Sequence, residues 1–345
     1  MTEKKTVIYR DATPETIETL GKLLRDGGLV AIPTETVYGL GANGLDSEAM
    51  SRIYEAKGRP SDNPLILHVP DMAAAKPLVK SLTPTAQRLM ERFWPGPLTI
   101  TLPKADCVPD RATGGLPRVA LRCPDHDLCR AVLTAAGVPV AAPSANISGR
   151  PSPTTADAVY DDMKGRIDAI LDAGTCDIGV ESTVVECGDD EVTILRPGGI
   201  TEQMLLEVVS KVNYDTALSS PTAVPKAPGM KYKHYAPDAP MITFVGTPEQ
   251  VANAIRQEDD FTEVGLFISE ETAKLLQVSP DNERCLVFGK AGDAKALAHA
   301  LYSGLLHFNG TKVPRILAEG VSEAGLGRAV MNRMLKASAR HVVKL

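Results

Sequence analysis

Apolar positions alternate between helical and strand spacing through the first two hundred residues. Recurrence every three to four positions after a Thr-Pro or acidic start predicts helices at 14 to about 27, 48–57, 84 to about 93 and 125–136, and a further helix capped by Thr154 or Thr155. Short apolar runs predict strands at 29–32, 65–69, 98–102, 119–122 and 138–142, and a hairpin of 183–186 with 192–195. Helix crossovers combined with a hairpin predict a twisted mixed sheet with helices on it.

The second part of the chain has a different pattern. Residues 215–240 hold five prolines and little apolar periodicity, which is typical of an extended linker. Strands predicted at 241–245, 265–268, 284–288 and 315–317 then alternate with helices from 248, at 293–308 and from 326. Such alternation predicts a small, parallel, Rossmann-like α/β domain. We therefore expect a first domain at 1–212, a linker at 213–240 and a second domain at 241–345.

Composition narrows the classes of protein. A net charge of −6 argues against a surface that grips a nucleic-acid backbone, although a local basic pocket is compatible with it. The N-terminus has no apolar signal segment, and no apolar run approaches the ~20 residues of a membrane helix. The six cysteines form no C-x-x-C pair, so we expect reduced thiols, no zinc site and a cytoplasmic protein.

Several common catalytic motifs are missing from the sequence. It contains no Walker A sequence, no G-x-S-x-G elbow and no H-E-x-x-H. Gly325-Leu-Gly327 is a fragment of a dinucleotide-binding pattern, and packing at a helix start explains it without a cofactor.

Three loops instead carry cationic or hydroxyl side chains where strands or helices end: Pro33–Gly41, Lys57–Pro64 and Pro143–Pro153. Ligands of open α/β sheets bind at the carboxyl ends of strands, and such loops suit a phosphate. Each feature alone has a simpler interpretation. Lys57 and Arg59 could be solvated charges beside a helix C-terminus, and His68 could be a satisfied core histidine. Arg122 could pair with a nearby carboxylate, and the other loops could be ordinary turns and caps. Together, the loops indicate a basic pocket for an anionic ligand.

Seven strings in order carry a family resemblance: PTETVYGLG, KGRPSDNPL, WPGPLT, APSANISGRPSPT, ESTVVE, ILRPGG and PGMKYKHYAP. With them the chain resembles the threonylcarbamoyl-AMP synthase family in its two-domain form, in which a YrdC-like domain precedes a Rossmann-like one. GLGRAVMNRMLKAS resembles the C-terminal domain of that family. Two small departures are Glu186, where an Asp is usual, and Cys123, in a slot that is often aliphatic.

The resemblance implies a reaction in two parts. The amine of L-threonine takes up bicarbonate or CO₂, and the resulting N-carboxylate attacks the α-phosphate of ATP, which gives threonylcarbamoyl-AMP and pyrophosphate. Other proteins then transfer the product to tRNA. The carboxylate is its own nucleophile, so positioning and charge neutralisation suffice.

The resemblance also implies roles for particular residues. The catalytic group would be Lys57, Arg59, Ser144 and Asn146. Further contacts to ATP would come from Asn63, Ser152, Arg196 and Tyr235. The threonine contacts would be Thr36, His68, Arg122, Ala142 and Ser182. Mg²⁺ would accompany ATP and be held mostly by phosphates and water, with no protein metal site. The linker, with Tyr235, would act as a lid.

Two other functions remain as alternatives. Hydrogenase maturation factors perform related carbamoyl-adenylate chemistry, but they carry paired C-x-x-C zinc motifs that this sequence does not contain. An RNA-binding module could use the same basic concavity. Against it stand the acidic net charge and the shortage of stacking aromatics near the basic motifs, so we expect direct tRNA binding to be weak or absent.

Overall fold

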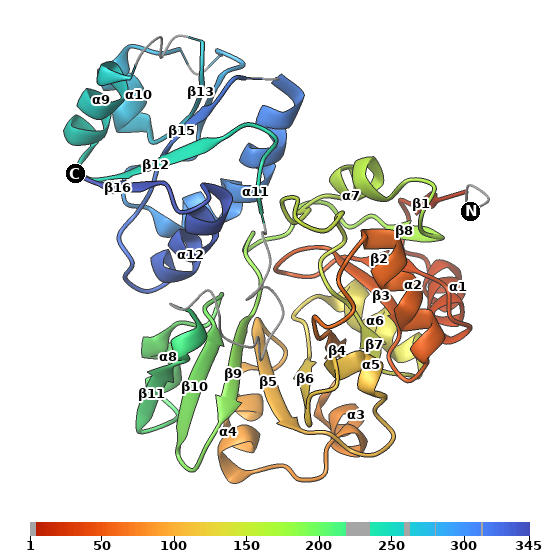
Figure 1. Cartoon of the computed structure of the whole chain (residues 1–345). Coiled ribbons are helices and arrows are strands. Elements are labelled where there is room, and N and C mark those ends of the chain that lie inside the picture. Colours follow the sequence, from red (N-terminus) through yellow and green to blue (C-terminus); the bar gives the residue numbers. More distant parts are fainter. Residues whose placement is uncertain (1–4, 219–234, 259–262, 280, 312) are drawn as a thin grey trace. The chain divides into compact units, whose positions relative to one another are not determined.

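The computed structural model describes residues 5–218, 235–258, 263–279, 281–311 and 313–345. These residues form two compact units, and Figure 1 shows the elements of each. The first unit holds the described residues up to 218, except two short segments, 149–151 and 178–180, that belong with 235–345 in the second unit. Most of the predicted linker and its proposed action as a lid lie outside the described residues.

The first unit is built on a mixed sheet. Among the described residues its eleven strands are β1 (Val7–Tyr9), β2 (Val30–Ile32), β3 (Gly39–Asn43), β4 (Ile66–His68), β5 (Leu98–Pro103), β6 (Arg118–Arg122), β7 (Val140–Ala141), β8 (Ala169–Leu171), β9 (Thr183–Cys187), β10 (Glu191–Arg196) and β11 (Lys211–Tyr214). They lie in the order β1-β8-β2-β3-β7-β4-β6-β5-β9-β10-β11, with parallel and antiparallel pairs interspersed. This confirms the predicted mixed sheet and the hairpin of β9 with β10. β11 continues past residue 212, where the first domain was expected to end.

Helices cover the sheet on both faces. Those of the first unit are α1 (Pro14–Arg25), α2 (Ser47–Lys57), α3 (Met72–Ala75), η1 (Lys76–Leu78), α4 (Pro84–Phe93), α5 (Asp110–Thr113), α6 (Asp127–Ala136), α7 (Ala156–Met163), α8 (Glu202–Leu206) and η2 (Thr216–Leu218).

Caps and close packing fix several of these helices. The Thr155 side chain accepts a hydrogen bond from Ala158 N and so caps α7, as one of the two predicted alternatives stated. α1 and α6 pack together so closely that a Cβ on Gly21 would lie 2.6 Å from Ala135.

One face of β5 bears directly on function. Leu98, Ile100 and Leu102 alternate along the strand and pack in a core with α4. Side chains alternate between the two faces of a strand, so Thr99 and Thr101 project from the opposite face. α4 therefore covers one side of β5 and leaves the two threonines to the other side.

The second unit has a parallel sheet, as predicted, but it contains five strands where four were expected, because the last strand, at 342–344, was not predicted. Its strands are β12 (Met241–Val245), β13 (Gly265–Ile268), β14 (Cys285–Val287), β15 (Ile316–Glu319) and β16 (Val342–Lys344), in the order β14-β13-β15-β12-β16. All four strand pairs in the described part of this sheet are parallel. Its helices are α9 (Pro248–Gln257), α10 (Glu270–Leu276), α11 (Ala294–Thr311) and α12 (Gly327–Ala337). A Cβ on Gly327 would lie 2.0 Å from Ser322 O, so packing accounts for that glycine.

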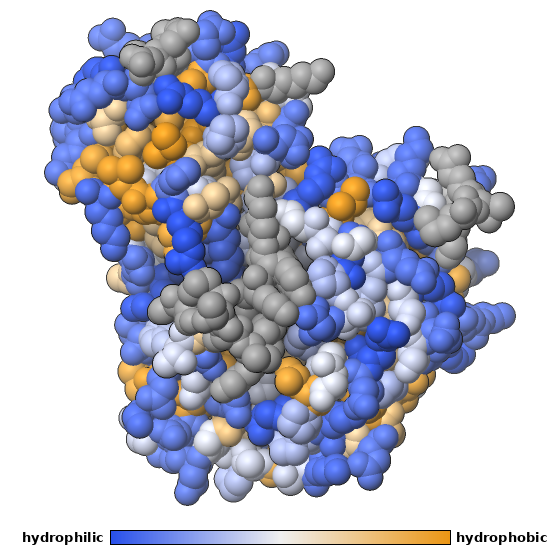
Figure 2. Space-filling model, in the orientation of Figure 1, coloured by the Kyte–Doolittle hydropathy of each residue, from blue (hydrophilic) through white to orange (hydrophobic). Residues whose placement is uncertain are grey.

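Surface and thiols agree with the composition. Figure 2 shows hydrophilic residues over much of the visible surface and hydrophobic ones on the second unit. Among the described residues, no helix is long and apolar enough to cross a membrane. The six cysteines are unpaired; four are buried and Cys107 is exposed.

Candidate active site

The first site loop is the connection between β2 and β3. The Thr34 hydroxyl accepts hydrogen bonds from Thr36 N at 3.1 Å and Val37 N at 3.2 Å, which fixes a tight turn. The Thr36 hydroxyl lies 2.8 Å from that of Thr34 and is fully buried. Ala145 N donates to Tyr38 O at 2.8 Å, so this loop and the loop after β7 are joined.

A second group forms around the end of α2. Gly58, at φ 61°, ends the helix in the left-handed conformation and directs the chain away after Lys57. The Lys57 ammonium donates to the carbonyls of Ser144 at 2.6 Å and Asn146 at 2.5 Å, and the Ser144 hydroxyl donates to Asn146 Oδ1 at 2.5 Å. The structure thus brings three of the four predicted catalytic residues into direct contact.

Lys57 is 2% exposed, so its alternative interpretation as a solvated charge at a helix end is wrong. The periodicity of α2 could not reveal this, because the burial comes from the loop after β7. Burial and, next, the charge of Arg59 hold the pKa of Lys57 well below its usual value, while Asp162 acts in the opposite direction. A bound anion would favour the charged ammonium.

Arg59 and Asn63 lie on the loop that follows α2. Arg59 is partly buried and donates to Pro64 O at 3.2 Å, and its charge acts on Lys57. Asn63 is 2% exposed, and its carbonyl accepts from the Tyr54 hydroxyl at 3.1 Å. Arg59 therefore lies close enough to Lys57 for their charges to interact, and the contacts of both residues with a nucleotide stay predictions.

A third group lies on the sheet. His68 on β4 and Arg122 on β6 are register partners in a parallel pair, so their side chains share a face. The Ser182 hydroxyl lies 2.8 Å from that of Thr99 and accepts from Arg196 Nη2 at 3.2 Å. Burial, then the charges of Arg122 and Arg196, lower the pKa of His68 to about 3. His68 is therefore a neutral hydrogen-bonding group at physiological pH.

The alternative interpretation of Arg122, that it pairs with a nearby carboxylate, is confirmed, although the sequence did not identify Glu35 as the partner. Its Nη2 lies 2.7 Å from Glu35 Oε2, and both side chains are about 95% buried, with exposures of 5% and 6%. Glu35 stands in the first site loop between two of the threonines, so the motif contained it. Nothing in the sequence indicated that the loop after β2 meets the end of β6.

The remaining predicted residues have separate surroundings. Ala142 N donates to Ile66 O, which places Ala142 beside β4. Ser152 is buried and donates to Glu181 Oε1 at 2.7 Å. Tyr235 belongs to the second unit, where it stacks on Tyr302 with ring centroids 5.4 Å apart. Its predicted contact with the nucleotide stays a prediction.

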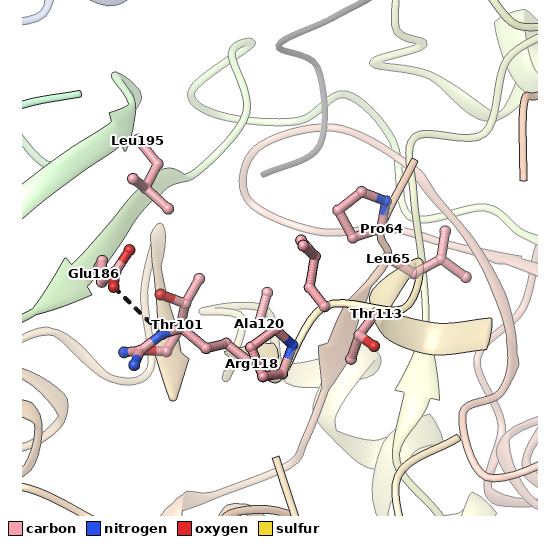
Figure 3. Close-up of a pocket in the computed structure, with 10 residues that line it drawn as sticks. Pro64, Leu65, Thr101, Thr113, Arg118, Ala120, Glu186 and Leu195 are labelled. Carbon is pink, nitrogen blue, oxygen red and sulfur yellow. Dashed lines mark hydrogen bonds and ion pairs between the residues drawn. The ribbon is translucent and has the colours of Figure 1, made fainter. Parts of the chain in front are cut away.

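A cavity of about 190 Å³ extends the site along the same sheet face. It is lined mainly by apolar groups, with Arg118 and Glu186 as an ion pair at 3.7 Å; the full lining is Pro64, Leu65, Thr101, Thr113, Leu116, Pro117, Arg118, Ala120, Glu186 and Leu195. In Figure 3, Pro64 and Leu65 lie across the cavity from Glu186 and Leu195.

The cavity and the third group share strands. Ala120 alternates with Arg122 on β6, and Thr101 alternates with Thr99 on β5, so each pair faces the same side. Two residues of strand span roughly 7 Å. The cavity therefore lies about that far along the sheet from Arg122 and Thr99, and the loop that follows Lys57 borders the cavity through Pro64.

Comparison with known families covers nearly the whole chain. The family described as "Telomere recombination" matches residues 22–198, and the one described as "Threonylcarbamoyl-AMP synthase, C-terminal domain" matches residues 200–339.

Two curated relatives are similar over almost their full length. Threonylcarbamoyl-AMP synthase of Bacillus subtilis is 45% identical over 324 residues, with 93% of this chain and 92% of the relative covered. The Pyrococcus abyssi enzyme of the same name is 44% identical, with 93% and 94% covered.

A solved structure also resembles this one. The crystal structure of P. abyssi Sua5 complexed with L-threonine matches with a TM-score of 0.89 and 41% identity, and 99% of each chain is covered.

Proposed function

The chain belongs to the threonylcarbamoyl-AMP synthase family, and we infer that it is an enzyme that makes threonylcarbamoyl-AMP and pyrophosphate from L-threonine, ATP and a one-carbon donor. The observation that carries this inference is the gathering of buried Lys57, Arg122 and Arg196 around hydroxyls and loop carbonyls in one unit. The reaction brings together three anionic groups, namely the threonine carboxylate, the N-carboxylate formed from the one-carbon donor and the ATP phosphates. Neutralising their mutual repulsion is therefore the main catalytic task.

We propose that L-threonine lies at the Arg122 end of the sheet face. A guanidinium is a good bidentate partner for the α-carboxylate. Neutral His68 and the Ser182 hydroxyl can exchange hydrogen bonds with the threonine hydroxyl at no cost in charge. Thr36 and Ala142 complete the predicted set of threonine contacts on the adjoining loops. The crystallised P. abyssi relative with bound L-threonine supports the assignment of the substrate.

For ATP we propose that the base enters the cavity lined by Pro64 and Leu195. Its volume is smaller than the roughly 300–1,000 Å³ of pockets that enclose drug-sized ligands, so it suits a part of a ligand such as a planar base. Pro64 and Leu195 directly neighbour Asn63 and Arg196 in the chain, two of the predicted nucleotide contacts. The phosphates would then extend towards Lys57, Arg59 and Ser144.

These placements put the threonine amine and the α-phosphate of ATP between the Arg122 end of the sheet face and the cavity. The unprotonated threonine amine adds to CO₂ with loss of a proton, or reacts with bicarbonate with loss of water. The resulting N-carboxylate then attacks the α-phosphate while pyrophosphate leaves. Lys57, charged once anions surround it, and Arg59 stabilise the charge on the phosphorus centre. Ser144 and Asn146 hold the loop that orients Lys57. We propose that Mg²⁺ arrives with ATP as part of the substrate, held mainly by phosphates and water.

The wider role follows from the product. An acyl-adenylate is a donor for group transfer, and we propose that other proteins pass its threonylcarbamoyl group to tRNA in the cytoplasm. The alternative, an RNA-binding module, would need exposed cations to contact phosphates. Here Lys57, Arg122 and Arg196 are buried at 2–5% exposure, so they suit a small ligand better. A salt-dependent titration with RNA tests this choice.

The proposed reaction is tested by product analysis. We expect ATP consumption to require both L-threonine and bicarbonate and to release pyrophosphate. Threonine-independent hydrolysis to ADP and phosphate would refute the proposal. Omitting one substrate at a time supplies the control.

A further inference from the structure

Glu35 is a buried carboxylate that the proposed mechanism does not use. Its Oε2 lies 2.7 Å from Arg122 Nη2. Four further titratable groups interact electrostatically with Glu35, namely Cys123, His126, Cys129 and Cys176, and none of them carries a charge at neutral pH. Burial lowers the pKa of His126, against the opposing effect of Glu35, and burial raises the pKa of the three thiols. Arg122 is therefore the cation that balances Glu35.

The pair is close in distance but incomplete in hydrogen bonding. Both carboxylate oxygens of Glu35 and the Nε and Nη2 atoms of Arg122 are buried and have no aligned hydrogen-bond partner in the described part of the chain. Buried charged atoms without such partners are costly. A ligand that supplies both an acceptor for Arg122 and a positive charge near Glu35 would recover that cost.

The proposed reaction makes this charge arrangement useful. Its substrates present three kinds of anion: the threonine carboxylate, bicarbonate and the ATP phosphates. An isolated buried arginine would attract any of them. Beside Glu35, a simple anion is attracted by Arg122 but repelled by the Glu35 carboxylate. A zwitterion is attracted by both residues, because its carboxylate faces Arg122 and its ammonium faces Glu35. Discrimination between ligands commonly relies on such a repulsive element.

We propose that Glu35 is a specificity-determining residue that makes the Arg122 subsite select a zwitterionic α-amino acid over simple anions, bicarbonate among them. The inference rests on the proposed function, because it assumes that Arg122 receives the threonine carboxylate. It assigns Glu35 a role that differs from merely orienting Arg122. An orienting residue would affect every carboxylate ligand equally, whereas this role depends on the charge of the ligand.

Calorimetric binding to the full-length protein without ATP tests the proposal. The two ligands are L-threonine and 2,3-dihydroxybutanoate of matching stereochemistry, in which a hydroxyl replaces the ammonium. We expect the wild type to prefer threonine by about 10- to 100-fold. In Glu35→Gln the preference should fall towards one, because threonine binds more weakly and the analogue more tightly, and bicarbonate should begin to compete with threonine. Glu207→Gln, which removes a half-exposed carboxylate paired with Arg92 at 3.1 Å, is the matched control and should keep the wild-type preference.

The other outcomes are also decisive. If Glu35→Gln weakens both ligands by the same factor, Glu35 only orients Arg122 and the proposal is overturned. Equal binding of both ligands to the wild type overturns it as well. If Glu35→Gln does not fold, Glu35→Asp retains the charge and must keep most of the preference, and its loss there counts against the proposal. Absence of any threonine binding by the wild type would instead refute the proposed function.

Discussion

Two arginines on the same face of β6 face glutamates in different surroundings. Arg118 Nε lies 3.7 Å from Glu186 Oε1, with side chains 29% and 33% exposed. Arg122 lies 2.7 Å from Glu35, and both are about 95% buried. The Arg118–Glu186 pair is only partly exposed, and a loosely spaced pair near the surface contributes roughly 0–1 kcal/mol and is screened by salt. A buried pair has a large desolvation cost, so removing one partner leaves a charge that nothing solvates. The same two residue types thus have a small effect at the cavity end of the site, as Arg118 and Glu186. At the other end, Arg122 and Glu35 are needed for the subsite to fold.

The strongest way to break the comparison is Arg122→Ala. It should abolish threonine-dependent pyrophosphate release and lower the free energy of unfolding by about 3–5 kcal/mol, because Glu35 is left buried without its counter-charge. The double variant Glu35→Gln/Arg122→Met should recover most of the stability but no activity. Urea unfolding and a pyrophosphate assay measure the two effects. A single variant as stable as the wild type would contradict the buried-pair interpretation.

Lys57 extends the comparison to a buried cation held by carbonyls. We expect Lys57→Ala to reduce kcat by about 10²- to 10³-fold, the effect of removing a charge stabiliser from the transition state. It should also lower stability by about 1–3 kcal/mol, because two carbonyls lose a charged donor. Lys80→Ala, at an exposed pair with Asp106, is the control and should change neither quantity appreciably. An unchanged kcat in folded Lys57→Ala would remove this residue from the catalytic group.

A smaller effect is expected from the pH dependence of His68. Its pKa is about 3 in the folded chain and near 6.5 when unfolded, so below pH 6.5 the unfolded state binds the proton and the folded state does not. Stability should therefore fall as pH falls from 6.5 towards 3. Urea unfolding at pH 7, 5.5 and 4.5 should show a shallower loss for His68→Gln than for the wild type. Identical slopes would show that His68 is not held neutral.

The smallest effect on stability and binding should come from the partly exposed pair of Arg118 and Glu186. Glu186→Gln should change the free energy of unfolding by no more than about 1 kcal/mol and raise KM for ATP at most about fivefold. The Kd for L-threonine should stay unchanged, because Glu186 lies at the cavity end of the sheet face. Calorimetry with each ligand separates the two ends. A change in threonine affinity would show that the ends are coupled.

Local sequence signals predicted the framework of the site well. The apolar run before Pro33, the Thr154-Thr155 start of a helix and the strict strand–helix alternation after residue 240 depend on neighbours in the chain. The structure places the loops after β2, α2 and β7 together, as the rule for strand ends implied. The sequence therefore shows which candidate site residues lie at the end of a strand or helix.

Partners and burial were not readable in the same way. Lys57 looked like a surface charge at a helix end, and only the loop from Ser144 to Asn146 covers it. Glu35 was recognised as part of a motif but not as the partner of Arg122, because their contact depends on which loop meets the end of β6. β1 and β8 are three-residue strands whose pairing joins distant parts of the chain, so periodicity had too few positions to detect them.

The pairing of β1 with β8 also has a consequence for synthesis of the chain. Val7 pairs with Ala169, so the first strand made waits for a partner that is translated 162 positions later. At about 5–20 residues per second, that delay is roughly ten to thirty seconds. β2, which carries the loop of Glu35 and Thr36, needs the same partner. A nascent chain therefore cannot complete its amino-acid subsite until β8 has emerged, and Ser182, which follows β8 in the chain, adds a further wait.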